Sequence, residues 1–489
     1  MGRTLDLLHT LSGRAQATEG RGPAPIRPLC ALVLLFVFAT QCLLPPSALA
    51  WGEFTYKDEA ELGKKFNVLV RSRMPIIQDP EITSYMSYLI GRITKNMPRQ
   101  PFEFVPAMVI SPSLNAFATP GGYVFAYTGL VLALDNESDL AGVMAHELAH
   151  VTQRHIARRI ENSQIWSVLS VLGVLAGAFL GGDAGSAAAV GSVAASHTAM
   201  LDYSRTDESE ADQVGMGFLV DAGYNPYGMA RAFNVLSQKQ WLLGSNIPAY
   251  LSTHPNLADR VRETTIRADR LPAQQRNIKD DNRRFKRIQA LIRARYSDPQ
   301  AATLRFNSDT SGPDKCLAYM GLGIVASRQN RVNDAASFFD KAIECSGKDP
   351  LILREAGRFH YAKGNSNRGG ELLQQAVAID RNDIMALFFL SRYQADRGQT
   401  RDAINNMQVV LRATPEDAEV HQFLAKFHGQ GKDLFSANLH MAYSYLYMNN
   451  AGKTEQFLKL AKDLASTPEQ QDRLARLTRA YNERKEFWK

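Results

Sequence analysis

The chain has 489 residues, of which 45% are hydrophobic and 21% are charged. This length predicts two or three globular units, each able to bury an apolar core. The formal net charge of +7 is small for so long a chain. The charge therefore excludes the strongly basic class of nucleic-acid-binding proteins, and we expect no nucleic acid among the partners.

Residues 1–50 have the pattern of a secretory signal peptide. Arg27 precedes an apolar stretch at 29–39, and the small-residue site Ala48-Leu49-Ala50 follows it. Because the stretch is too short to span a bilayer as a stable helix, we predict cleavage after Ala50 and export of the remaining chain. A retained N-terminal anchor is the alternative.

The first part of the exported chain is predicted to combine helices with a small sheet. Apolar residues at helical spacing favour helices over 58–74 and 81–97, separated by a break at Pro80. The run 102–110 is typical of a strand, and the run 114–134 is typical of a hairpin that bends at a Gly-Gly pair.

Three helices are predicted next. The first covers 136–160, because Asn136 and Asp139 can cap its first turn. The other two cover 206–222 and 226–243.

Between the first two of these helices lies a run of small and apolar residues. Its apolar part, 165–180, is shorter than the roughly 20 residues of a membrane span. The run is either a mobile lid or membrane-surface element near the active site, which implies peripheral membrane contact, or a buried hairpin of small-residue helices.

The second half of the chain contains an internal repeat with a period of 34 residues. Two small positions and one large apolar position recur in phase. The three sets are Gly323, Gly357 and Ser391; Ala335, Gly369, Ala403 and Ala437; and Phe339, Leu373, Met407 and Met441. This is the tetratricopeptide pattern, in which each repeat is a helix pair that buries its apolar face against its neighbours.

Two of the four cysteines remain after export. Cys30 and Cys42 lie in the signal peptide, whereas Cys316 begins the first helix of the first repeat and Cys345 ends the second. Antiparallel packing of these helices would bring the two sulfur atoms together, so we predict a disulfide. Two buried free thiols are the alternative.

The sequence His146-Glu147-Leu148-Ala149-His150 carries the chemistry. On a helix the two histidines lie on one face, so both rings can reach one metal ion. Glu147 is then placed to act as a general base on an attacking water without being a ligand.

A catalytic zinc needs a third protein ligand. Glu208 is the favoured candidate, and Asp212, four residues on, faces the same side of the helix and could orient a ligating imidazole. Glu210 lies on another face and is less favoured. His155 lies about 140° around the helix from His150, so we expect it to face away. These acids could also be a solvated helix start.

The combination resembles a known family. The HELAH helix, the helix with Glu208 and Asp212, the hairpin at 115–122 and the repeats are similar to the zinc metallopeptidases of the HtpX and CAAX-prenyl-protease family, and within it to periplasmic β-barrel assembly-enhancing proteases. The resemblance covers nearly the whole exported chain.

This resemblance implies a mainly α fold with a small β-sheet. A gluzincin-type metalloprotease domain at 51–270 would be followed by a helical linker at 271–311 and an α-solenoid of tetratricopeptide repeats at 312–489.

The resemblance also implies residue roles. One Zn²⁺ per chain would be held by His146, His150 and Glu208, with Glu147 as the catalytic residue. The edge strand on which an extended substrate pairs would include Asn115, Ala116 and Phe117.

Two residues further along the chain have expected roles at the same site. His254 looks like a loop histidine that takes the open metal position and switches the enzyme off. Arg260 could stabilise the developing oxyanion. Ordinary loop packing is the alternative for both.

The function implied is that of a periplasmic zinc-dependent endopeptidase. It would degrade misfolded or misassembled outer-membrane β-barrel proteins, assist their assembly as a chaperone, and contact their assembly machinery through the repeats. Two alternatives are a chaperone or scaffold that acts mainly through its repeats with latent proteolysis, and an integral-membrane quality-control protease.

Overall fold

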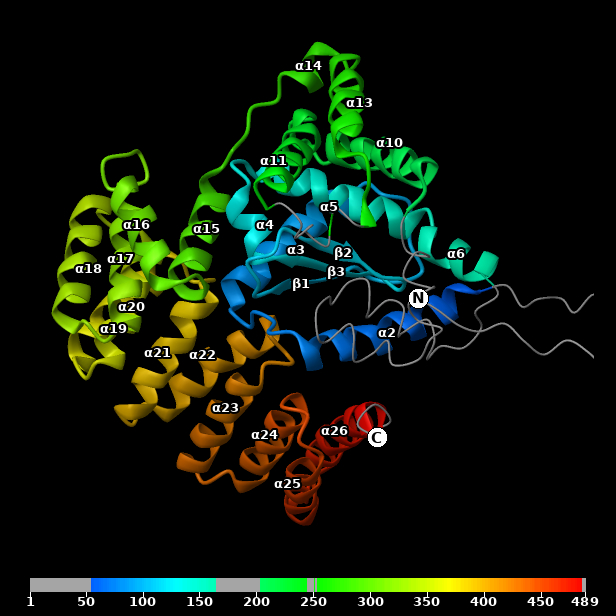
Figure 1. Cartoon of the computed structure of the whole chain (residues 1–489). Coiled ribbons are helices and arrows are strands. Elements are labelled where there is room, and N and C mark those ends of the chain that lie inside the picture. The colour runs from blue at the N-terminus through cyan, green and yellow to red at the C-terminus, as the bar shows by residue number, and fades with distance from the viewer. Residues whose placement is uncertain (1–53, 164–202, 244–249, 251–252, 486–489) are drawn as a thin grey trace, which may run out of the picture. The chain divides into compact units, whose positions relative to one another are not determined.

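The computed structural model describes residues 54–163, 203–243, 250 and 253–485. The expected signal peptide at 1–50 and the apolar run 165–180 lie outside these residues. The described chain is mainly helical with one three-stranded sheet, as the sequence predicted (Figure 1). Within the described ranges, no helix has both the length and the apolar content that crossing a membrane requires.

Two helices come first, α2 (Tyr56–Arg73) and α3 (Pro80–Thr94). The predicted break between them is confirmed, because the Asp79 side chain accepts hydrogen bonds from the backbone of Glu81 and Ile82 and Pro80 begins the helix. A capped start with proline in the first turn is a strong helix signal, since proline has no N–H to leave unpaired there.

The sheet contains β1 (Val105–Val109), β2 (Ala116–Ala118) and β3 (Tyr123–Tyr127). Its order is β1-β3-β2, with β1 parallel and β2 antiparallel to β3, so β2 is an edge strand. The predicted hairpin is therefore confirmed. Its bend needs glycine at Gly122, where φ is 89° and a Cβ would lie 2.6 Å from the Glu103 carbonyl oxygen.

The expectation that the hairpin continues to residue 134 is wrong. The chain instead forms helix α4 (Thr128–Ala133). Thr128 ends the strand, since its hydroxyl donates to the Ser111 carbonyl at 2.8 Å and the Gly129 N–H donates to the same oxygen. A short apolar run does not show by its periodicity whether it is strand or helix.

Helix α5 (Glu137–Thr152) is the central element of the first half, because almost all its residues are buried. It contacts β2 and two helices, α10 (Arg205–Asp221) and α11 (Tyr227–Leu243). A Cβ on Gly215 of α10 would lie 3.1 Å from the His146 Cα. The missing side chain thus lets α10 approach α5 closely.

The single helix predicted over 136–160 is two helices. Helix α5 ends at Thr152, and α6 (His155–Ser163) begins after Arg154, whose φ of 56° is left-handed. A left-handed residue cannot continue a right-handed helix, so the chain changes direction there.

Four helices follow the first half. They are α13 (Leu257–Asp269), α14 (Ala273–Arg276), α15 (Arg283–Tyr296) and α16 (Pro299–Asp309). Helix α15 packs against α3 and α4 on one side and against the first repeat helix on the other. Gln289 at its centre donates to the Val131 and Leu134 carbonyls at 2.8 and 2.7 Å. The helix thereby connects both halves of the chain.

Ten helices make up the repeat array and its tail, arranged in successive antiparallel pairs (Figure 1). They are α17 (Lys315–Arg328), α18 (Val332–Ser346), α19 (Pro350–Ala362), α20 (Ser366–Ile379), α21 (Ile384–Asp396), α22 (Thr400–Ala413), α23 (Ala418–Gln430), α24 (Leu434–Tyr447), α25 (Ala451–Leu464) and α26 (Pro468–Lys485). The predicted small positions lie at helix contacts: a Cβ on Gly323 would lie 3.0 Å from the Phe339 ring. Cys316 of α17 and Cys345 of α18 are joined by a disulfide.

A buried ion-pair network holds the repeats against α3. Arg354 of α19 pairs with Glu81 of α3 and, at 3.0 Å, with Asp383, which caps the start of α21. Arg295 of α15 pairs with Asp79 and, at 2.6 Å, with Glu355. Removing one partner of a buried pair costs several kcal/mol, on the order of 3–5, because it leaves an uncompensated charge.

Candidate metal centre

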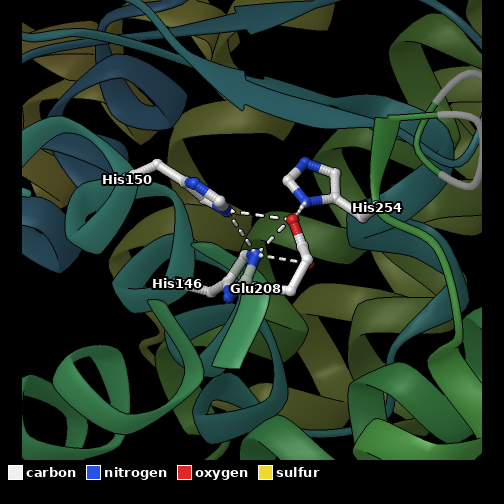
Figure 2. Close-up of side chains that lie close together, drawn as sticks. All are labelled: His146, His150, Glu208 and His254. Atoms are coloured by element: carbon white, nitrogen blue, oxygen red, sulfur yellow. Dashed lines mark hydrogen bonds and ion pairs between the residues drawn. The ribbon is translucent and has the colours of Figure 1, made fainter. Parts of the chain in front are cut away.

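Three segments bring four metal-binding side chains together (Figure 2). His146 and His150 come from α5, Glu208 from the first turn of α10, and His254 from the segment before α13. Each offers one ligand atom, and these atoms lie within 4.8 Å of one another. All four side chains are buried.

The two histidines of α5 meet Glu208 as the sequence predicted. Their Nε2 atoms are 3.0 Å apart, and the Glu208 carboxylate oxygens lie 3.5 Å from His146 Nε2 and 3.4 Å from His150 Nε2. In a tetrahedral zinc site with Zn–N distances of about 2.0–2.1 Å, neighbouring donors are about 3.3 Å apart. These three donors therefore fit a zinc ion.

His254 completes the set as a fourth donor. Its Nδ1 lies 2.9 Å from Glu208 Oε1 and 3.2 Å from His146 Nε2. The ring of Tyr250 stacks on it, with ring centroids 4.4 Å apart. His254 therefore borders the same small space as the other three donors.

Glu147 is buried beside this group but is not one of its donors. Its Oε1 has no hydrogen-bond partner among the described residues and lies 3.5 Å from His254 Nε2. Burial raises the pKa of Glu147 to about 7, opposed in part by a hydrogen bond from the Ala118 backbone of β2.

The surroundings keep His146, His150 and Glu208 in a metal-binding form. Burial lowers the pKa of His146 to about 4 and that of His150 well below its ordinary value, which leaves both rings neutral. Burial disfavours the charge of Glu208, but His254 and Arg260 outweigh it and hold the pKa of Glu208 well below its ordinary value. Metal binding needs this combination of neutral imidazoles and an ionised carboxylate.

Asp212 and Arg260 lie directly behind His146. Asp212 Oδ1 is 2.9 Å from His146 Nδ1, the ring nitrogen that points away from the other donors. Arg260 donates to both Asp212 oxygens, at 2.8 and 2.7 Å, and also pairs with Glu208. Its guanidinium therefore lies against two carboxylates of the centre.

The expectation that His155 faces away is wrong. Because Arg154 breaks the helix, His155 turns back, and its Nδ1 lies 2.6 Å from His150 Nδ1. Its Nε2 lies 3.1 Å from Glu210 Oε2. No glycine or proline marks this break, so the break could not be expected from the residue types there.

Tyr203 is a further contact that the sequence did not indicate. Its ring stacks on His150 with centroids 3.8 Å apart, and its N–H donates to the Thr253 carbonyl at 3.3 Å. It thereby joins the residues before α10 to the segment that carries His254.

The candidate substrate strand also lies at the centre. Asn115, Ala116 and Phe117 are buried in and next to β2, the sheet edge that packs against α5. The next residue, Ala118, is the one whose backbone reaches Glu147. The edge strand and the buried carboxylate are therefore adjacent.

Comparison with known proteins matches this part of the chain to one family. Residues 77–268 match the model described as peptidase family M48. A putative beta-barrel assembly-enhancing protease of Vibrio cholerae is 36% identical over 228 residues, which cover 46% of this chain and 46% of that protein. The match thus spans less than half of that relative's length.

A longer match extends into the repeats. The beta-barrel assembly-enhancing protease of Escherichia coli K12 is 26% identical over 375 residues, covering 75% of this chain and 76% of that protein. Among solved structures, YrrB, a tetratricopeptide-repeat protein with an unusual peptide-binding site, matches with a TM-score of 0.25 and 18% identity, covering 37% of this chain and 86% of that one.

Proposed function

We propose that this chain, whose residues 77–268 match the model of peptidase family M48, is a periplasmic zinc-dependent endopeptidase that degrades misfolded or misassembled outer-membrane β-barrel proteins. The observation that carries the proposal is the convergence of His146, His150 and Glu208 beside the buried Glu147.

The donor set supports zinc as the metal, one ion per chain. Two imidazoles and one carboxylate are typical of catalytic zinc sites, and the Glu208 carboxylate lies within 3.5 Å of both imidazole Nε2 atoms. When bound, zinc supplies Lewis-acid polarisation of the scissile carbonyl and lowers the pKa of a water molecule there to about 7.

Glu147 would handle the proton in this reaction. Its unpartnered Oε1 takes the proton from the attacking water as the C–O bond forms, and it then delivers that proton to the leaving amine nitrogen as the C–N bond breaks. Arg260 would stabilise the negative charge that develops on the carbonyl oxygen, since its guanidinium lies beside Glu208.

The substrate would bind as an extended strand along β2. An edge strand presents unpaired backbone groups, so a peptide added there is held mainly by its backbone. Because Ala118 of β2 contacts Glu147, such a peptide would pass the proton acceptor. This mode requires an unfolded or partly folded client, which suits removal of failed β-barrel proteins.

His254 would hold the enzyme closed. Its Nδ1 lies 2.9 Å from Glu208 Oε1, so the ring would block a substrate carbonyl from approaching the metal. Moving the segment before α13 would open the centre, so activity is proposed to depend on displacement of this loop.

The client class and the location rest on similarity. The relatives from Vibrio cholerae and Escherichia coli are described as beta-barrel assembly-enhancing proteases. By extension, the repeats would contact the barrel assembly machinery in the periplasm, and their stacked helix pairs offer the extended surface that such binding uses.

One experiment tests the proposal. Metal analysis of the purified exported chain and of Glu208→Gln is combined with cleavage of casein and of an unfolded outer-membrane β-barrel protein. We expect about one zinc per wild-type chain with cleavage of the unfolded protein, and loss of both in the variant. Zinc-free wild type that still cleaves would overturn the assignment.

The closed position of His254 also favours a second function, that of a chaperone with latent proteolysis. Glu147→Gln distinguishes the two functions. A chaperone retains its effect on β-barrel assembly in this variant, whereas a protease loses clearance of misassembled protein.

A further inference from the structure

The two zinc-ligand histidines of α5 have different partners on their outer nitrogens. His146 Nδ1 contacts the carboxylate of Asp212 directly, at 2.9 Å. His150 Nδ1 contacts another ring, His155 Nδ1, at 2.6 Å, and His155 Nε2 then contacts Glu210 Oε2 at 3.1 Å. The second ligand is thus connected to its carboxylate through an intervening imidazole.

The positions of the hydrogen atoms in the series His150–His155–Glu210 follow from the ligand role of His150. Its Nε2 faces Glu208 and His146, so it must present a lone pair there and carry its proton on Nδ1. That N–H donates to His155 Nδ1, which must therefore be an acceptor. His155 then carries its own proton on Nε2 and donates it to Glu210.

The surrounding residues hold His155 and Glu210 in place. His155 is buried at 1% exposure, next to the helix break at Arg154. Arg154 is itself anchored, since its Nε donates to Glu59 at 2.6 Å. Arg158 donates to Glu210 at 2.9 Å, on the same oxygen that His155 contacts.

We propose that His155 and Glu210 are positioning residues that orient the His150 ring for metal binding. This inference rests on the proposed zinc site. Partners of this kind raise the basicity of a ligating imidazole and fix its orientation, and losing one typically weakens metal binding by about 10–100-fold.

A rival interpretation is a second metal site at the same residues. The ligand atoms of His155, Asp207 and Glu210 lie within 4.8 Å of one another. However, Asp207 is bound by Arg159 at 3.0 Å, Glu210 is bound by Arg158, and the other His155 nitrogen is used by His150. These contacts leave the three residues already paired within the protein, which favours the positioning role.

The test measures zinc affinity of the full exported chain by competition with a chelator of known affinity. His155→Phe keeps an aromatic ring but removes both nitrogens, and His155→Asn keeps an acceptor near the Nδ1 position. Glu210→Gln removes the terminal charge. Glu344→Gln is the matched control, because it makes the same Glu→Gln change at an exposed residue of α18, in the first repeat.

We expect His155→Phe to weaken zinc binding by about 10–100-fold. His155→Asn should restore most of the affinity, and Glu210→Gln should have a smaller effect. Combining His155→Phe with Glu210→Gln should be no worse than His155→Phe alone, because the two residues act in series. The absorption spectrum of the cobalt-loaded protein should change in His155→Phe and not in Glu344→Gln.

The outcomes separate this inference from the proposed function. Wild type without zinc would overturn the zinc site itself. Normal zinc in the wild type with unchanged affinity and cobalt spectrum in His155→Phe would overturn only the positioning role, provided that the metal-free variant melts like the wild type. Two zinc ions per wild-type chain, one of them lost in His155→Phe, would favour the second site and also overturn it.

Discussion

Histidines gather at two places in the described chain, one in the first half and one in the repeats. His146, His150 and His254 surround Glu208 at the candidate metal centre. His421 of α23 and His440 of α24 meet where these two helices pack, and their Nδ1 atoms are 2.9 Å apart. Both groups are buried, so burial alone does not distinguish them.

The carboxylates distinguish the two groups. At the metal centre, three buried carboxylates contact the rings, those of Glu147, Glu208 and Asp212. At the repeat cluster, the carboxylate paired with a ring among the described residues is Asp433, which is 44% exposed and contacts His428 at 3.2 Å. His421 instead contacts the Pro415 carbonyl at 3.1 Å and stacks on Tyr443.

The ring nitrogens of the two histidine groups are also used differently. The metal centre points its donor atoms at one common position, whereas the repeat cluster uses its rings to fill the contact between two helices. Histidine can serve either purpose, and an ionised carboxylate among neutral rings is what makes a cation favourable. The comparison therefore predicts chemistry at one cluster and only stability effects at the other.

The largest expected difference is in catalysis. Glu147→Gln should lower kcat/KM for an unfolded β-barrel protein by about 10²–10⁴-fold, since it removes the general base. His421→Gln, made in the repeat cluster, should leave kcat/KM within error of the wild type. Steady-state cleavage assays with both variants check this, and similar losses in the two would contradict the comparison.

Metal removal should give the next largest difference between the two histidine clusters. A ligand present at a thousandfold excess over its dissociation constant stabilises the folded form by about 4 kcal/mol. Chelation should therefore increase hydrogen exchange in α5 and α10, which carry the ligands, and leave α23 and α24 unchanged. Hydrogen exchange with mass spectrometry measures this, and adding zinc back is the control. Equal loss of protection in both regions would count against a local site.

The part of the metal centre that depends on local spacing could be predicted from the sequence. His146 and His150 share a helix face, and so do Glu208 and Asp212, and the structure brings these faces together. Each pair is four residues apart, so its geometry does not depend on the rest of the fold.

The part that depends on a backbone break could not be predicted. His155 was placed by assuming one continuous helix, and the left-handed Arg154 invalidates that assumption. Left-handed residues are usually glycine or asparagine, so an arginine there gives no warning. The start of α4 at Thr128 was missed for a similar reason, since it depends on a contact with the distant Ser111.

The repeat array shows the same division. Its small and large positions follow a fixed period, so the packing of Gly323 on Phe339 could be expected. The pairing of Arg354 with Glu81 could not, because it depends on how the array lies against α3.

Acid should destabilise the repeat cluster through His421. Burial lowers the pKa of His421 from 6.5 to about 4, so between these values the unfolded state binds a proton that the folded state does not. Stability is therefore complete above about pH 6.5 and is lost as the pH falls toward 4, by about 3 kcal/mol at about 1.4 kcal/mol per pH unit.

Hydrogen exchange of residues 418–447 between pH 7 and 5, corrected for the intrinsic pH dependence of exchange, measures this loss. His421→Gln does not titrate, so it should reduce the slope. An unchanged slope would show that other groups control the acid response.

The smallest expected effect is at His254, where the two clusters can be compared by removing one ring from each. His254→Ala should raise cleavage of an unfolded β-barrel protein by up to about tenfold, because a resting state that is closed in about nine molecules of ten can gain no more than that when opened. His440→Ala removes a buried ring from the repeat cluster and should not raise activity. The increase should appear in kcat/KM with the zinc content unchanged, since His146, His150 and Glu208 remain.

If His254→Ala instead lowers activity with full zinc, His254 assists the reaction and does not block it. In that case the centre seen here is closer to a working arrangement than to a closed one.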